Sequence, residues 1–83
     1  MIKQIIRLFP GFKYGLRRDT LIMQQHIVGQ IESVDTFEDA RNLLASLVMN
    51  GYLEYKPSEP SKLGTTMAGW VLSDKGCQIY LTM

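Results

Sequence analysis

The side chains that could do covalent or metal chemistry are isolated from one another in this sequence. There is one histidine, His26, and one cysteine, Cys77. Neither has a partner at the spacing of a metal site or of a nucleophile and its base. No glycine-rich phosphate loop and no pair of carboxylates suited to acid and base catalysis stands out. We therefore expect no enzyme, no cofactor and no metal, with His26 as a surface or packing residue and Cys77 as a small apolar residue.

Charged side chains are segregated along the chain, although the net charge is only +1. Residues 1–18 carry five basic side chains and no acid, whereas residues 19–59 carry seven acids and two bases. The basic run Lys13, Arg17 and Arg18, with Tyr14 inside it, is a candidate for contacts with DNA phosphates or with an acidic protein. The alternative is scattered surface charge that keeps the domain soluble.

The size and composition of the chain predict one small globular domain over residues 1–83. A hydrophobic fraction of 46% is sufficient for a core without cross-links. A lone cysteine indicates a reducing, cytoplasmic compartment. Lys3 and Arg7 interrupt the apolar beginning of the sequence, which makes it a poor secretory signal and too short to span a membrane.

The residues from 35 to 55 organise the rest of the chain. Apolar residues recur three or four positions apart and predict a helix with one buried stripe. Asp35 is the expected N-cap, and Glu38 three residues later completes a capping box. The stripe consists of Phe37, Ala40, Leu44, Leu47 and Val48.

A hairpin is expected to follow this central helix directly. Asn50 and Gly51 tolerate the left-handed conformation that ends a helix. Residues 52–56 then alternate as a strand, residues 57–66 form a turn-rich connection, and residues 67–72 return as a second strand. Ser73 can cap a last helical turn or two.

Two further helices are expected before the central one. Helical spacing up to Pro10 is shown by Ile2, Ile5, Ile6 and Phe9. Because the isoleucines are β-branched, a strand is the alternative for this segment. Residues 12–17 alternate and predict an extended segment. Asp19 or Thr20 can cap a second helix through about Ser33, in which Gly29 marks a break or a close crossing. Its apolar stripe is Met23, Ile27, Ile31 and Val34.

Helices leading into LVMNGYLEY, a hairpin, and a return strand ending in VLSDKG resemble the winged helix-turn-helix superfamily. The similarity is greatest to bacterial regulators of the multiple-antibiotic-resistance type, and it covers residues 20–81. The resemblance implies an α+β winged-helix domain with three helices, a C-terminal two-stranded wing and a short final helix. Two features depart from the family: a longer second helix, and residues 12–18, which have no counterpart.

In that superfamily the third helix enters the major groove, and exposed residues of its first two turns meet base edges. The resemblance places Thr36, Glu38, Asp39, Arg41, Asn42 and Ser46 there, with Arg41 suited to guanine and Asn42 to adenine. Phosphate contacts are assigned to Lys13, Arg17, Arg18 and Lys62. The implied function is a small transcriptional regulator that binds double-stranded DNA, and the compact size suggests a phage or other mobile element as its source.

Acidic residues on the same helix support a second hypothesis. Glu38 and Asp39 would repel phosphates, so the module could instead bind a basic protein, for assembly or to inhibit a nucleic-acid-binding protein. The acids assigned to that surface are Glu32, Asp35, Glu38 and Asp39. A third alternative is an ordinary solvated helix face.

Oligomeric state is open at this level. Regulators of this type often dimerise through terminal helices, so the apolar residues between positions 2 and 9 could form a homodimer interface as readily as a core.

Overall fold

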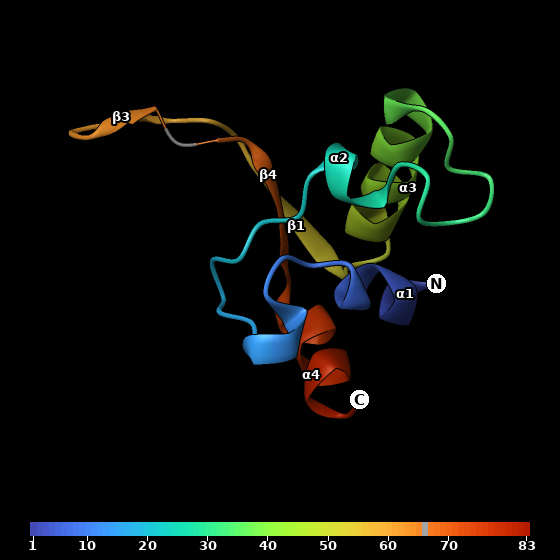
Figure 1. Cartoon of the computed structure of the whole chain (residues 1–83). Coiled ribbons are helices and arrows are strands. Elements are labelled where there is room, and N and C mark those ends of the chain that lie inside the picture. Colours follow the sequence, from blue (N-terminus) through green and yellow to red (C-terminus); the bar gives the residue numbers. More distant parts are fainter. Residues whose placement is uncertain (66) are drawn as a thin grey trace.

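A computed structural model describes residues 1–65 and 67–83 as a small α+β domain. Its helices are α1 (Ile2–Arg7), the 3-10 helix η1 (Phe12–Tyr14), α2 (Gln24–Ile27), α3 (Phe37–Met49) and α4 (Asp74–Leu81). Its strands are β1 (Leu53–Lys56), β2 (Pro60–Ser61), β3 (Gly64–Thr65) and β4 (Gly69–Leu72). Figure 1 shows the helices gathered in one body, from which the hairpin of β1 to β4 projects.

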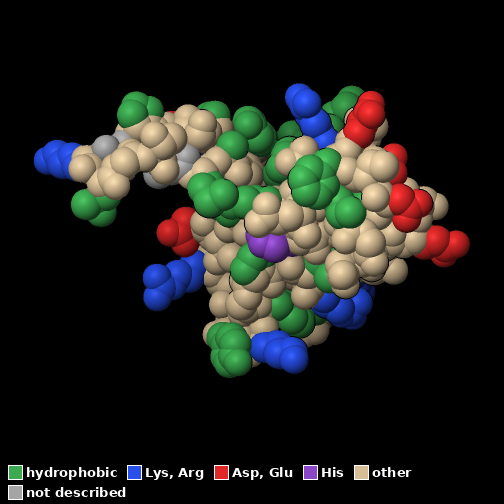
Figure 2. All heavy atoms as spheres, turned by 45° about the horizontal axis from the view of Figure 1, so that its top comes forward, with side chains coloured by type: hydrophobic (Ala, Val, Ile, Leu, Met, Phe, Trp, Pro, Cys, Tyr) green, Lys and Arg blue, Asp and Glu red, His purple; other side chains and the backbone are tan. Residues whose placement is uncertain are grey.

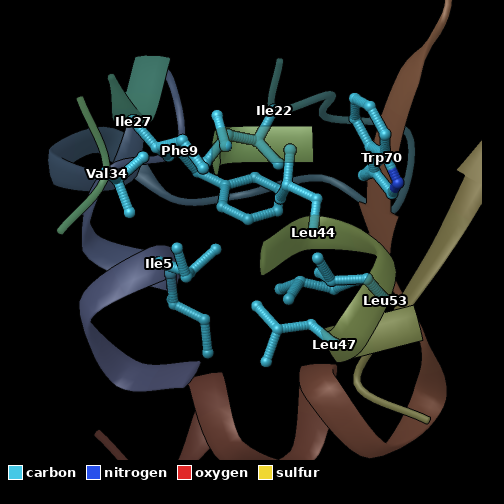
Figure 3. Packing of buried hydrophobic residues seen from close by; sticks show 12 residues of the cluster. Ile5, Phe9, Ile22, Ile27, Val34, Leu44, Leu47, Leu53 and Trp70 are labelled. Carbon is cyan, nitrogen blue, oxygen red and sulfur yellow. The ribbon is translucent and has the colours of Figure 1, made fainter. Parts of the chain in front are cut away.

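The first helix forms as expected, and its apolar residues belong to the core of this chain. Ile5 and Ile6 are 0% exposed, and Phe9 just after the helix is 3% exposed. These side chains pack with residues of α3 and the hairpin (Figure 3). Ile5, Ile6 and Phe9 are therefore core residues, while Ile2 is half-buried at the edge of the core.

Residues 12–33 differ from the prediction in two places. Residues 12–17 are not extended, because η1 forms between Gly11 and Gly15, which both have positive φ. The second helix is a single turn, α2, instead of a helix from 19 or 20 to 33. Val28 leaves the helical conformation, and Gly29 and Ser33 have positive φ angles of 76° and 71°. These two residues fold the remainder into a loop, which still buries Val34.

The central helix is present, but its first residue is not where the sequence placed it. Thr36, and not Asp35, is the N-cap: its Oγ1 accepts from the Asp39 N–H at 3.0 Å. The Asp39 carboxylate, and not Glu38, completes the capping box by accepting from the N–H groups of Asp35 and Thr36, each at 3.2 Å. Polar side chains at positions 35, 36, 38 and 39 allow either register, so local spacing alone did not decide it.

The apolar stripe of α3 is narrower than predicted. Ala40, Leu44 and Leu47 are buried, and Val48 packs against the core while half-buried. Phe37 is instead 59% exposed. With the cap at Thr36, Phe37 is the first helical residue and lies to one side of the buried stripe.

The end of α3 and the hairpin follow the prediction closely. Gly51 has a φ of 83°, as the left-handed helix end requires. In the antiparallel pair, Leu53 lies opposite Leu72 and Lys56 lies opposite Gly69. Both strands begin slightly later in the chain than predicted and end at the predicted residue. The turn between β2 and β3 holds Lys62 and Leu63. Within the predicted connection, Thr66 lies outside the described residues.

Ile22 adds a third stretch of backbone to this sheet. Its N–H donates to the Trp70 carbonyl at 2.8 Å, and the Trp70 N–H donates to the Ile22 carbonyl at 2.9 Å. The hairpin strand β4 therefore lies between β1 and Ile22. Since α2 begins two residues after Ile22, this bridge fixes α2 beside the base of the hairpin.

The last helix is capped as predicted and closes the domain. The Ser73 Oγ accepts from the Gly76 N–H at 3.1 Å and also donates to the Gly51 carbonyl. Lys75 Nζ donates to the Asn50 carbonyl at 3.2 Å and lies 4.3 Å from the centre of the Tyr52 ring. These contacts join the end of α3, the start of the hairpin and the start of α4 at one point.

Candidate nucleic-acid interface

The exposed side of α3 borders two adjoining hollows on the surface. The first, here called the hairpin hollow, has a volume of about 610 Å³ and lies between α3 and the hairpin. The second, the α2 hollow, has a volume of about 580 Å³ and lies over the start of α3. The hairpin hollow is lined by Gln24, Arg41, Ala45, Val48, Met49, Tyr55, Ala68 and Trp70, and the α2 hollow by Gln24, Phe37, Glu38, Arg41 and Asn42.

Arg41 supplies the positive charge in the lining of both hollows. It lines both hollows, as does Gln24, the first residue of α2. Asn42 lines the α2 hollow beside them and is exposed. Guanidinium and carboxamide groups offer the paired donors and acceptors that match base edges. The predicted pair of Arg41 and Asn42 is thus brought together, with Gln24 as a third member.

Thr36 and Asp39 cap the start of α3. The Thr36 hydroxyl oxygen and the Asp39 carboxylate accept the backbone hydrogen bonds of the capping box. Removing either group would leave N–H groups of the first turn without that partner. Their first role is therefore to fix the direction in which α3 presents Arg41.

The hairpin supplies an aromatic wall and a basic tip. Tyr55 on β1 packs against Trp70 on β4, with ring centres 5.2 Å apart, and both line the hairpin hollow. Lys62 lies in the turn at the far end, followed by Leu63, which is fully exposed. In Figure 2 the hairpin projects well beyond the body and carries a basic side chain at its end.

The basic run of residues 13–18 lies elsewhere. Arg17 and Arg18 line a hollow beside α4, and the Leu16 N–H donates to the Tyr80 hydroxyl at 3.1 Å. Arg18 pairs with Asp74 at 2.9 Å, with both side chains more than 80% exposed. Lys13 in η1 lines another hollow, near Phe12. None of the three basic residues lines the hairpin hollow or the α2 hollow.

Of the four acidic residues assigned to a protein-binding surface, three are exposed and one takes part in the helix cap. Glu32 and Asp35 are exposed in the loop before α3, and Glu38 is exposed in its first turn at the α2 hollow. Asp39 is half-buried and engaged in the cap. Figure 2 shows several acidic side chains at the end of the body opposite the hairpin, and another on the side below the hairpin. Three of the four predicted acids therefore remain available to a partner.

Sequence reasoning missed Gln24 and the exposure of Phe37 at this surface. Gln24 was read as the interior of a long helix, where its side chain had no assigned role. The Ile22 bridge that places it beside Arg41 joins residues 48 positions apart, which no local pattern reveals. Phe37 has the spacing of the buried stripe, so periodicity alone could not reveal its exposure at the first position of the helix.

His26 and Cys77 stand apart from both hollows. The His26 Nδ1 accepts from the Met23 N–H at 2.9 Å, which closes the single turn of α2. Partial burial lowers the pKa of His26 from its ordinary value. Cys77 is half-buried on α4. Among residues 1–65 and 67–83, no three His, Cys, Asp or Glu side chains are grouped as a metal site would require.

No helix in the described part of the chain has the length and apolar character needed to cross a bilayer. Comparison with known protein families, with curated proteins and with solved structures finds no match to this chain.

Proposed function

We propose that the chain is a winged-helix module that binds duplex DNA through α3 and the projecting hairpin. The proposed fold is supported by the order of the elements: α1, α2 and α3 precede the hairpin, and α4 closes the domain. It is supported further by the short connection from the end of α3 at Met49, through Gly51 with its positive φ, to the start of β1. The hairpin takes the place of the wing.

One observation carries the proposed function: Arg41 lies between the two hollows with Gln24 and Asn42 beside it. In this arrangement Arg41 donates two hydrogen bonds to the O6 and N7 atoms of guanine, and an amide neighbour pairs with adenine. Each such pair contributes about 1 to 3 kcal/mol of discrimination against the wrong base. Lys62 at the hairpin tip reaches a phosphate beyond the groove that α3 occupies.

Two arginines provide the test, since each is an exposed cation of the same type on a different surface. Arg41→Ala should weaken binding to a preferred duplex by tenfold or more, because a guanine contact is lost. Arg17→Ala, beside α4, should leave binding within about twofold, because that residue faces away from the duplex. Fluorescence anisotropy with labelled duplexes measures both, and circular dichroism checks that each variant is folded.

Equal losses for the two variants would show that binding depends on overall charge and not on the α3 surface. Absence of duplex binding by the unaltered chain, even at low salt, would exclude the proposed function.

A second candidate function is recognition of a basic protein, and Glu38 is the observation in its favour. Its carboxylate is exposed in the first turn of α3 at the rim of the α2 hollow, with Glu32 and Asp35 in the preceding loop. Glu38→Lys separates the two functions. It should strengthen duplex binding by removing repulsion from phosphates, whereas it should abolish binding to a basic protein surface.

A further inference from the structure

Three side chains one helical turn apart form a stripe along the exposed side of α3. Arg41 lies in the middle of this stripe, with Phe37 one turn before it and Ala45 one turn after it. Phe37 lines the α2 hollow, Ala45 lines the hairpin hollow, and Arg41 lines both. A single cation is thus flanked on each side by an exposed apolar group.

Phe37 is the unusual member of the stripe. Its side chain is 59% exposed and is absent from the cluster of core side chains and their half-buried neighbours. Burying a phenylalanine side chain stabilises a folded protein, and more than half of the Phe37 side chain does not contribute in this way here. Since exposed aromatic side chains contribute strongly to binding surfaces, Phe37 is better explained by a ligand than by the fold.

We infer that this stripe reads a guanine flanked by thymines, an inference that rests on the proposed binding of duplex DNA. In the major groove, the C5-methyl of thymine is the apolar group that a base pair presents, and phenylalanine and alanine both pack against it. Arg41 takes the guanine edge between them. Phe37 and Ala45 each cover a thymine methyl, so the stripe selects a base pattern and not merely a phosphate backbone.

Helix geometry sets the spacing of that pattern. Four residues of an α-helix advance about 6 Å along its axis. Base pairs are stacked about 3.4 Å apart along one strand. With α3 lying along the groove, the thymines therefore fall about two base pairs to either side of the guanine, on either strand.

The composition of the stripe favours DNA over a protein helix as the occupant. An apolar protein segment seated on Phe37 and Ala45 would cover Arg41 between them, and burying an unpaired guanidinium is costly. Gln24 and Asn42 lie beside that same group, so the polar groups needed to pair with base edges are already adjacent. The hollows accept base edges without leaving the cation unsatisfied.

The test begins with selection of preferred duplexes from a random-sequence pool by the full chain at low salt. Each thymine of the selected duplex is then replaced by deoxyuridine, which removes the methyl and keeps the pairing. We expect a loss of about fourfold for each methyl that the stripe covers, from the transfer free energy of one methylene-sized group. Replacement at positions away from the stripe should change the affinity by less than twofold.

Phe37→Ala and Tyr14→Ala form a matched pair of exposed aromatic substitutions. Tyr14 is 93% exposed in η1, on the surface of the basic run. Phe37→Ala should make the thymine and deoxyuridine duplexes bind equally at one position, whereas Tyr14→Ala should retain the difference.

Selected duplexes without thymines near the guanine, or equal affinity after every replacement, would overturn this inference while duplex binding itself stood. Failure to retain any duplex from the pool at low salt would overturn the inference together with the proposed function.

Discussion

His26 shows how one side chain can make a single helical turn sensitive to acid. Its Nδ1 must be unprotonated to accept the Met23 N–H, and partial burial also favours the neutral ring. Both effects act at the first turn of α2, which carries Gln24 to the hollows. The ring thus holds in place a residue of the proposed interface without being part of it.

We predict that the free energy of unfolding falls as the pH is lowered through the titration of His26. The unfolded chain has the ordinary pKa of 6.5 and the folded chain a lower one, so protons bind more tightly to the unfolded state. Stability from this residue is fully present above that value and is lost as the pH falls through the folded pKa.

Urea denaturation at several pH values between about 7.5 and 5.5, where carboxylates stay charged, measures this dependence. His26→Gln, which does not titrate, should give a flat profile over that interval. The same slope in the variant and in the unaltered chain would assign the effect to another group.

At the scale of elements, the N-terminus of α3 depends on Thr36. A capping side chain satisfies an N–H of the first turn that otherwise has no partner within the helix. Thr36 Oγ1 fulfils that role by accepting from the Asp39 N–H, and the Asp39 carboxylate accepts from the Thr36 N–H.

Two neighbouring alanine substitutions test this position of the cap. Thr36→Ala should lower the free energy of unfolding by about 1 kcal/mol, the usual cost of losing an N-cap. Asp35→Ala should change it by less than about 0.5 kcal/mol, since the side chain is exposed and outside the cap. Thermal or urea denaturation compares the two, and the reverse order would restore Asp35 as the cap.

Elements with strong local signals could be predicted, and those set by distant contacts could not. Gly51 ends α3 and Ser73 caps α4 as expected, because each signal lies within the few residues it controls. The second helix is shorter than predicted, because the apolar spacing continues past Ile27 at the end of α2 into a loop that buries Val34. The extended conformation of Val28 and the positive φ angles of Gly29 and Ser33 turn the chain out of the helix there.

The same division applies to the candidate site. Arg41 and Asn42 could be placed on an exposed helix face by periodicity alone. The location of Lys13, Arg17 and Arg18 could not, because it is set by contacts with α4, more than 50 positions later in the chain. A run of basic residues in the sequence is therefore not sufficient evidence that these residues share a binding surface with α3.

For the whole molecule, the separation of the two basic surfaces limits how many phosphates the proposed DNA interface could neutralise. Near the hollows and along the hairpin the cations are Arg41, Lys56 and Lys62, while the basic run lies beside α4. The interface can therefore neutralise only a few phosphates. If the chain binds DNA as proposed, base contacts must therefore supply more of the affinity than is usual for a basic DNA-binding domain.

We predict a shallow dependence of binding on salt. Each neutralised phosphate contributes about −0.9 to the slope of the logarithm of affinity against the logarithm of salt concentration, so two or three contacts give about −2 to −3. Lys62→Ala should reduce the slope by about 1, whereas Lys13→Ala should leave it unchanged. A slope near −5 would mean that the basic run also contacts the duplex.

The hairpin has a buried base and an exposed end, and these two parts are under different constraints as the sequence evolves. Leu53, Trp70, Val71 and Leu72 are held in the core, and Ile22 is paired to them, so substitutions there are constrained by folding. The turn at Lys62 and Leu63 contributes nothing to that core. Descendants of this chain can therefore lengthen, shorten or recharge the end of the hairpin, and so acquire new targets, while inheriting the same domain.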